Sequence, residues 1–164
     1  MTYRILTVCT GNICRSPMAE VVLATKLAEA GLEAQVDSAA VTSYEVGNPI
    51  DYRAAKTLRQ AGYEVPEREA RKVTPEDFDD FDLILPMTVQ HKDELIRMAR
   101  RWGRGQGHAQ IDLFRTFTKE YRSGKDSELD VPDPWYGTQA DFAATLETIE
   151  SAVPAIAKHV AESV

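Results

Sequence analysis

Cys9 and Arg15 are the two residues of this sequence whose types and spacing best fit a chemical role. Five residues separate them, and residues 9–17 read CTGNICRSP. A cysteine thiolate is a strong nucleophile, and the planar guanidinium of arginine can hold two oxygens of a tetrahedral anion. The pair therefore predicts attack of the sulfur on a bound phosphate, which forms a covalent phosphocysteine.

The segment around these residues has the composition of an anion-binding loop. It follows a strand-like apolar run at residues 5–8 and leads into a helix that we expect to begin at Ser16, as N-cap, with a proline after it. A helix N-terminus directs backbone N–H groups and the positive end of its dipole toward one point, which suits phosphate. Gly11 and Asn12 tolerate the left-handed backbone that such a loop requires. We therefore expect Cys9 to be a thiolate near neutral pH.

Strand-like and helix-like segments alternate along the chain. Strands are expected near residues 5–8, 33–38, 82–86 and 109–113. Helices are expected near residues 16–31, 50–62, 74–77, 92–102 and 138–160, the last capped by Thr138 and kinked or interrupted at Pro154. This alternation predicts an α/β fold: a single-domain parallel sheet of about four strands with helices on both faces. The phosphate-binding loop would lie between the first strand and the first helix, at the carboxyl ends of the strands where such sheets hold their active sites.

Length, charge and cysteine content narrow the class of protein. The 164 residues (18.3 kDa) are predicted to form one domain, residues 1–164. A net charge of −7 argues against a nucleic-acid partner, and no apolar run is long enough for a membrane span. The N-terminus has no signal-peptide pattern, and two cysteines make no disulfide framework. We expect a cytoplasmic monomer or weak dimer with reduced thiols.

Residues 9–17 resemble the signature loop of the low-molecular-weight protein tyrosine phosphatases. The second signature of that family, Asp-Pro-aromatic-Tyr-Gly, is matched by the DPWYG sequence of residues 133–137. The resemblance spans essentially the whole chain. It implies a metal-independent protein-tyrosine-phosphatase that needs no cofactor, hydrolyses phosphotyrosine in proteins as well as small aryl phosphates, and has tyrosine-phosphorylated proteins as its partners.

The resemblance also implies a role for each matched residue. Cys9 would be the nucleophile, Arg15 would bind phosphate, and Asp133 would act first as general acid and then as general base. Ser16 would donate a hydrogen bond to the thiolate, and Asn12 would brace the loop. The residues that would hold the phosphate are Thr10, Gly11, Asn12, Ile13, Cys14, Arg15 and Ser16. The physical chemistry agrees, because the leaving group needs an acid other than the nucleophile and Asp133 lies in a stiff loop between two prolines.

The substrate cleft would be walled by the aromatic side chains of Tyr44, Trp135 and Tyr136. Cys14 resembles the second loop cysteine of the family, which can form a reversible disulfide with the nucleophile. The alternative for Cys14 is simple packing in the loop. The chain departs from the common family pattern at three positions, where it carries Tyr44 for tryptophan, Arg68 for histidine and Thr88 for aspartate.

Other functions fit the residues less well. A thiol-dependent arsenate reductase uses a similar loop, but it needs further cysteines near residues 80–90, where this chain has none. A non-catalytic phosphate-binding or redox-sensing module would not need Asp133. A zinc site at the two cysteines would need histidines nearby, but the histidines are distant in sequence and are expected on solvated faces: His91, His108 and His159. The basic run at residues 97–104 is expected to be a solvated helix end.

Overall fold

The computed structural model describes residues 2–118 and 125–164. Within these residues a four-stranded sheet has the order β2-β1-β3-β4, and every neighbouring pair is parallel. The strands are β1 (Tyr3–Cys9), β2 (Ala34–Ala40), β3 (Leu83–Pro86) and β4 (Gln110–Ile111). The predicted parallel α/β sheet is therefore confirmed.

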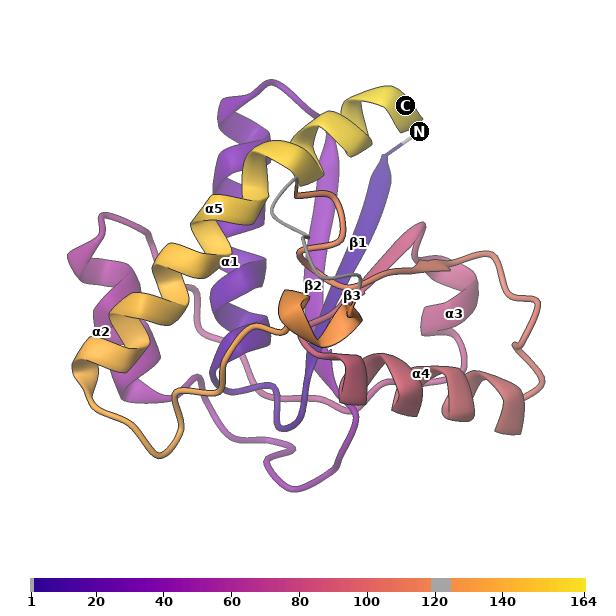
Figure 1. The fold of residues 1–164 in the computed structure, drawn as a ribbon, viewed down its shortest axis with the longest axis horizontal. Helices are drawn as coiled ribbons and strands as arrows, with labels where there is room; N and C mark the ends of the chain where they lie inside the picture. Colours follow the sequence, from indigo (N-terminus) through magenta and orange to yellow (C-terminus); the bar gives the residue numbers. More distant parts are fainter. Residues whose placement is uncertain (1, 119–124) are drawn as a thin grey trace.

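Helices cover both faces of the sheet, as predicted (Figure 1). The helices on the first face are α1 (Arg15–Glu29), α2 (Tyr52–Gln60) and α5 (Gln139–Ser163). Those on the second face are the short α3 (Asp77–Asp80) and α4 (Val89–Arg101). A 3₁₀ turn, η1 (Asp126–Leu129), precedes the loop that leads into α5.

The central strand β1 is buried on both of its faces. Ile5 packs into the core beneath α1, α2 and α5, whereas Leu6 and Val8 pack into the core beneath α3 and α4. Successive side chains of a strand point to opposite faces, so an unbroken apolar run suits a strand that is covered on both sides. Cys9 therefore lies at the end of a strand whose last five residues are all buried.

Helix α1 begins two residues earlier than its sequence suggests. Its first residue is Arg15, and Cys14 occupies the N-cap position without a capping hydrogen bond from its side chain. The expected N-cap role of Ser16 is wrong, because its hydroxyl lies against the sulfur of Cys9 instead. Pro17 still falls in the first turn, where its missing N–H breaks no helical bond. The helix ends at Glu29, and Gly31 follows in the predicted C′ position with a φ of 75°, the left-handed conformation that glycine adopts most easily.

Helix α5 runs through Pro154 without interruption. The expected interruption is therefore wrong: Val153 and Ile156 keep the apolar face packed, and Pro154 is exposed on the other side of the helix. The first turn is capped as predicted, with the Thr138 N–H donating to Oδ2 of Asp141 at 2.7 Å. Across the described ranges, neither α5 nor any other helix combines the length and apolarity needed to cross a membrane.

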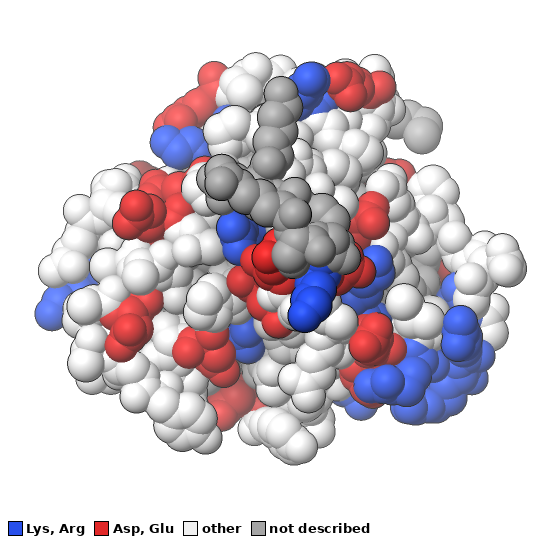
Figure 2. All heavy atoms as spheres, viewed as in Figure 1, with Lys and Arg blue, Asp and Glu red and all other residues white. Residues whose placement is uncertain are grey.

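The C-terminal end of α4 carries the predicted basic run. Figure 2 shows basic side chains gathered at its lower right, where α4 ends. Arg100 and Arg101 in the last turn are exposed, and Arg97 pairs with Glu94 at 2.7 Å. Cations at this end of a helix complement its dipole, which agrees with a solvated helix end.

The other end of α4 is attached to the loop that follows β1. His91 in the first turn of α4 is only 3% exposed, and its Nε2 lies 2.8 Å from Oγ1 of Thr10. The expectation that the histidines lie on solvated faces is wrong for His91, because its ring fills the space between the helix and the loop. Burial, aided by the positive charge of Arg15, lowers its pKa to about 3. His108 is exposed, whereas the ring of His159 is half-buried against Phe117.

The buried His91 predicts a loss of stability in mild acid. The unfolded chain binds a proton at this residue below about pH 6.5, whereas the native state does not until about pH 3. The free energy of unfolding should therefore fall by about 2 kcal/mol from this residue alone between pH 7 and pH 5. Urea denaturation of the wild type and of His91→Gln at both pH values measures this change. The difference in the free energy of unfolding between wild type and His91→Gln should be smaller at pH 5 than at pH 7. An equal difference at both pH values would contradict a buried, neutral His91.

Candidate active site

The loop after β1 forms the floor of a pocket at the carboxyl ends of the strands. The pocket has a volume of about 260 Å³. Its lining residues come from three segments: Cys9, Thr10, Gly11, Ile13, Cys14 and Arg15 from the first loop, Tyr44 and Glu45 from the loop after β2, and Asp133, Trp135 and Tyr136 from the loop before α5. The fold thus brings together the two sequence signatures, which lie more than a hundred residues apart in the chain.

Cys9 lies at the bottom of this pocket and is only 3% exposed. Its Sγ is 3.0 Å from Oγ of Ser16, and it accepts a hydrogen bond from the backbone N–H of Asn12 at 3.3 Å. Both contacts come from groups that can stabilise a negative charge on the sulfur.

Asn12 adopts the left-handed backbone that was predicted, with a φ of 62°. Its side chain is fully buried and donates through Nδ2 to Oγ of Ser16 at 2.8 Å and to Oγ of Ser38 at 2.9 Å. The same expectation is wrong for Gly11, which does not have a positive φ. A Cβ at this position would lie 3.1 Å from Cγ of Glu45, a tight contact that the Glu45 side chain would have to relieve by a small shift.

The backbone of the loop presents N–H groups that are available to an anion. Over the described ranges, no other part of the chain accepts a hydrogen bond from the backbone N–H groups of Gly11, Ile13, Cys14, Arg15 and Ser16. The last two belong to the first turn of α1, whose dipole is positive at this end. The side chains of Asn12 and Ser16, which were predicted to hold phosphate, are fully buried beneath the floor, so of these two residues only the backbone N–H of Ser16 is left without a partner.

Arg15 connects the loop to the segment that precedes α5. Its guanidinium is almost completely buried and donates through Nη1 to the carbonyl oxygen of Val131 at 3.0 Å. Nη2 lies 3.5 Å from Oδ2 of Asp133. The side chain of Asp133 is about half exposed at the mouth of the pocket, and its Oδ1 accepts a hydrogen bond from the N–H of Trp135. A cation is thereby fixed beside the pocket floor and a carboxyl group is placed above it.

The walls of the pocket are aromatic and solvent-exposed. Tyr44 is 81% exposed and Tyr136 is 96% exposed, so neither ring is packed into the core. Trp135 is held more firmly, because Arg53 donates to its carbonyl oxygen at 3.1 Å and places its guanidinium 5.3 Å from the ring centre. Arg53 and Glu45 were not predicted from the sequence, since only the approach of distant segments brings them to the pocket.

Cys14 lines the pocket beside Cys9, and its sulfur is also buried. Burial raises the pKa of this thiol, and the nearby carboxylate of Asp51 raises it further. Cys14 is therefore protonated at neutral pH, unlike a reactive thiolate.

Two departures from the common family pattern have visible contacts. Thr88 is the N-cap of α4, and its Oγ1 accepts the backbone N–H of His91. Arg68 lies against the back of the phosphate loop and donates to the backbone oxygen of Asn12 at 2.7 Å.

Comparison with known proteins identifies the group to which this pocket belongs. Residues 4–164 match the family model described as low molecular weight phosphotyrosine protein phosphatase. The chain is 36% identical over 166 residues to the low molecular weight protein-tyrosine-phosphatase of Streptomyces coelicolor, covering 100% of this chain and 97% of that protein. It is also 36% identical over 143 residues to the human low molecular weight phosphotyrosine protein phosphatase, covering 86% of this chain and 85% of that protein.

Solved structures support the same assignment. A protein tyrosine phosphatase from Entamoeba histolytica, crystallised with Hepes in its active site, superposes with a TM-score of 0.85 at 30% identity and covers 99% of each chain. The fold, the family model and the relatives therefore agree. This chain belongs to the low molecular weight phosphotyrosine protein phosphatase family.

Proposed function

We propose that this protein hydrolyses phosphotyrosine in proteins, and small aryl phosphates, through a phosphocysteine intermediate on Cys9. One observation carries the proposal: a buried sulfur lies at the floor of a loop of free backbone N–H groups, with the carboxyl group of Asp133 at the opening. A phosphate bound by those N–H groups and by Arg15 would have the sulfur on one side and the acid on the other. That arrangement suits in-line displacement at phosphorus.

In the first step, the Cys9 thiolate attacks phosphorus and the bond between phosphorus and the tyrosyl oxygen breaks. Asp133, in its protonated form, donates its proton to that oxygen, so tyrosine leaves as a neutral phenol. The negative charge of the transferring group is balanced by Arg15 and by the backbone N–H groups of the loop. The bound phosphoryl group competes with Asp133 for the guanidinium, which releases the carboxyl group toward the leaving oxygen.

In the second step, the Asp133 carboxylate takes a proton from a water molecule, whose oxygen attacks phosphorus. The bond between sulfur and phosphorus breaks, and inorganic phosphate is released. The sulfur leaves as a thiolate, which the Ser16 hydroxyl and the Asn12 N–H stabilise. Each turnover therefore consumes one water and regenerates the starting protonation states, and no metal ion takes part.

The shape of the pocket favours an aryl phosphate as substrate. Cys9 is 3% exposed, whereas Tyr44 and Tyr136, which also line the pocket, are exposed to solvent. A phosphate must therefore be carried on a group long and flat enough to reach the floor between these rings. A phenyl ring meets this requirement, and the short side chain of phosphoserine does not. We propose tyrosine-phosphorylated proteins as the partners and the cytoplasm, which keeps thiols reduced, as the location.

Replacing the nucleophile tests the proposal directly. Cys9→Ser should abolish hydrolysis of p-nitrophenyl phosphate, because a serine hydroxyl is not ionised at neutral pH and has no base to activate it. The wild type should keep its full rate in EDTA. Steady-state assays of both proteins, with the fold checked by circular dichroism, measure these effects. Residual activity of a folded Cys9→Ser would rule out the phosphocysteine route.

The acid is tested by Asp133→Asn, which keeps the shape of the side chain but removes its proton. We expect kcat to fall by about 10²–10⁴-fold with phosphotyrosine, the range that general acids contribute. The fall should be smaller with an aryl phosphate whose phenol leaves easily, because that leaving group needs less protonation. A uniform fall across leaving groups would mean that Asp133 is not the acid.

The two loop thiols predict a reversible response to oxidants. Peroxide should oxidise the Cys9 thiolate to a sulfenic acid, and the Cys14 thiol should displace water from it to form a disulfide that a dithiol reductant reopens. Cys14→Ala should therefore lose activity in peroxide as the wild type does but regain less of it with dithiothreitol. Activity assays before and after reduction measure the recovered fraction. Equal recovery in both proteins would leave Cys14 as a packing residue.

A further inference from the structure

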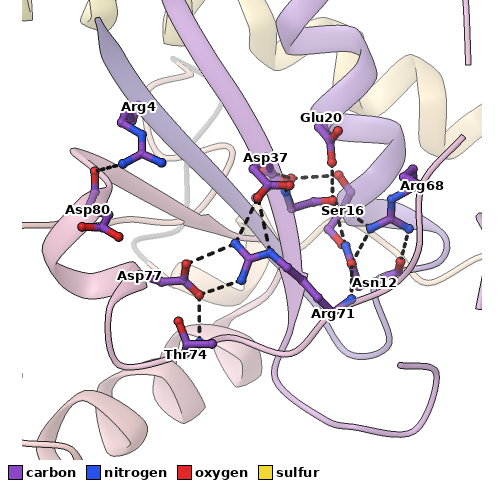
Figure 3. A network of polar contacts seen from close by, with 12 residues as sticks. Arg4, Asn12, Ser16, Glu20, Asp37, Arg68, Arg71, Thr74, Asp77 and Asp80 are labelled. Atoms are coloured by element: carbon purple, nitrogen blue, oxygen red, sulfur yellow. Dashed lines mark hydrogen bonds and ion pairs between the residues drawn. The ribbon is translucent and has the colours of Figure 1, made fainter. Parts of the chain in front are cut away.

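Two exposed arginines in the last turn of α4, Arg100 and Arg101, form no ion pair with any residue that the structure describes. Arg71 shows the opposite case, because it pairs with Asp37 at 3.1 Å and with Asp77 at 3.0 Å (Figure 3). The dipole of α4 favours cations at this end, but it amounts to only about half an elementary charge. An excess of positive charge therefore remains at the end of α4.

This basic patch differs from the rest of the surface. The chain has a net charge of −7, and Figure 2 shows acidic side chains spread over the visible face, whereas basic side chains gather at its lower right, where α4 ends. An acidic ligand is repelled by the net charge of the molecule and attracted to this one place. Charge complementarity of this kind speeds association and fixes where a partner docks.

A small apolar pocket lies beside the free arginines. It has a volume of about 120 Å³, and both Arg100 and Arg104 line it. Its apolar lining comes from α3, α4 and the start of β4: Phe78, Ile96, Ala99, Ala109 and Ile111. A dry cavity of about 150 Å³ can hold a benzene molecule. This pocket therefore has room for one aliphatic side chain.

Hydrogen bonds fix the loop that borders this pocket. The backbone N–H of Arg104 donates to the carbonyl oxygen of Ala99 at 2.6 Å, and the N–H of Gly107 donates to that of Arg104 at 2.9 Å. The Arg104 guanidinium donates to the carbonyl oxygen of Trp102 at 3.0 Å and lies 3.3 Å from Asp79. A Cβ at Gly107 would lie 3.0 Å from the Arg104 oxygen, so the loop packs closely there. The pocket is therefore preformed.

Helix α4 sets the distance between this pocket and the catalytic one. In its first turn, Nε2 of His91 lies 2.8 Å from Oγ1 of Thr10, which lines the catalytic pocket. The 13 residues of α4 span about 20 Å, so its last turn lies roughly that far from the loop after β1 (Figure 1). An extended chain advances about 3.3 Å per residue. A substrate therefore reaches the basic patch with residues about six or more positions from its phosphotyrosine.

We propose that Arg100, Arg101 and the apolar pocket beside them are a docking site for an acidic segment of the phosphoprotein substrate. Aspartate or glutamate side chains of the segment pair with the two guanidinium groups, and one aliphatic side chain enters the pocket. The segment lies about six to ten residues from the phosphotyrosine. The inference rests on the proposed function, because it assigns a sequence context to the same substrate. Docking at this site raises the effective concentration of phosphotyrosine at the catalytic pocket without touching the reacting atoms.

The test uses phosphotyrosine peptides that differ only in the distant segment. The acidic peptide carries the segment Glu-Asp-Leu-Asp-Glu about eight residues from the phosphotyrosine. A neutral peptide has glutamine and asparagine in place of the acids, and a third peptide has glycine in place of the leucine. Each peptide is made with the segment on the N-terminal side and on the C-terminal side. Steady-state kcat and KM are measured for all of them.

The double variant Arg100→Glu/Arg101→Glu reverses the charge of the patch. Lys56→Glu/Arg59→Glu is the matched control, because it reverses two exposed charges on α2 and changes the net charge by the same amount. Arg100→Gln/Arg101→Gln replaces the first variant if charge reversal destabilises α4. Urea midpoints and circular dichroism check each fold. Hydrolysis of p-nitrophenyl phosphate, which is too small to reach α4, reports on the catalytic pocket alone.

For the wild type, we expect kcat/KM for the acidic peptide to exceed that for the neutral peptide by about three- to tenfold in one orientation, mainly through KM. The preference should fall below about twofold in Arg100→Glu/Arg101→Glu, and also in the wild type at about 0.5 M NaCl. Lys56→Glu/Arg59→Glu should keep it. The peptide with glycine should lose part of the preference, and all variants should hydrolyse p-nitrophenyl phosphate at the wild-type rate.

Equal kinetics for the acidic and neutral peptides with the wild type, in both orientations, would overturn the proposal. A preference that both charge-reversal variants keep would do the same, and full preference without the leucine would contradict the role of the pocket. Sedimentation with vesicles of phosphatidylserine and phosphatidylcholine tests a different partner. Vesicle binding that Arg100→Glu/Arg101→Glu abolishes would assign the patch to a membrane and overturn the proposal. If the proposed function itself fails, the wild type does not hydrolyse p-nitrophenyl phosphate.

Discussion

The left-handed turn at Asn12 is the constraint on which the rest of the site depends. A residue other than glycine adopts this backbone at a cost, and here it does so in complete burial, where every polar atom must find a partner. The turn points the Asn12 N–H at the sulfur, and it allows the N–H groups that follow to face the same space. The side chains of Ser16, Ser38 and Arg68 form hydrogen bonds with Asn12, and these bonds offset the cost of its left-handed conformation.

A second requirement is that two remote segments meet at one cation. Arg15 is almost fully buried, yet both of its described polar contacts are with the segment before α5, through the carbonyl oxygen of Val131 and the carboxylate of Asp133. A single guanidinium thus fixes the loop after β1 against the loop that carries Asp133. Arg53 performs a similar task on the other side, where it links the start of α2 to Trp135. The pocket therefore depends on two arginines, Arg15 and Arg53, that connect segments distant in sequence.

Much of this arrangement could be predicted from the sequence, and the reasons for the failures are physical. The apolar run in β1 and the proline at the start of α1 are local signals, and they led correctly to a loop at the end of a central strand. Ser16 was wrongly predicted to cap the helix, because its hydroxyl forms a hydrogen bond with the sulfur of Cys9 instead. His91 was misread because its partner, Thr10, is 81 residues away along the chain, and no local pattern records that contact. Arg53 was missed for the same reason, since its contact with Trp135 depends on how α2 packs beside the last loop.

The contrast between the floor and the rim of the pocket has a consequence for how such an enzyme can change. The floor is enclosed by core residues and braced by the buried side-chain hydrogen bonds of Asn12, so replacement of a bracing residue disturbs folding along with chemistry. The rim is built from Tyr44 and Tyr136, whose rings make little contact with the rest of the molecule. Mutations at these two positions can alter what the pocket admits while leaving the free energy of unfolding nearly unchanged. The rim of this pocket can therefore be altered by mutation independently of its floor.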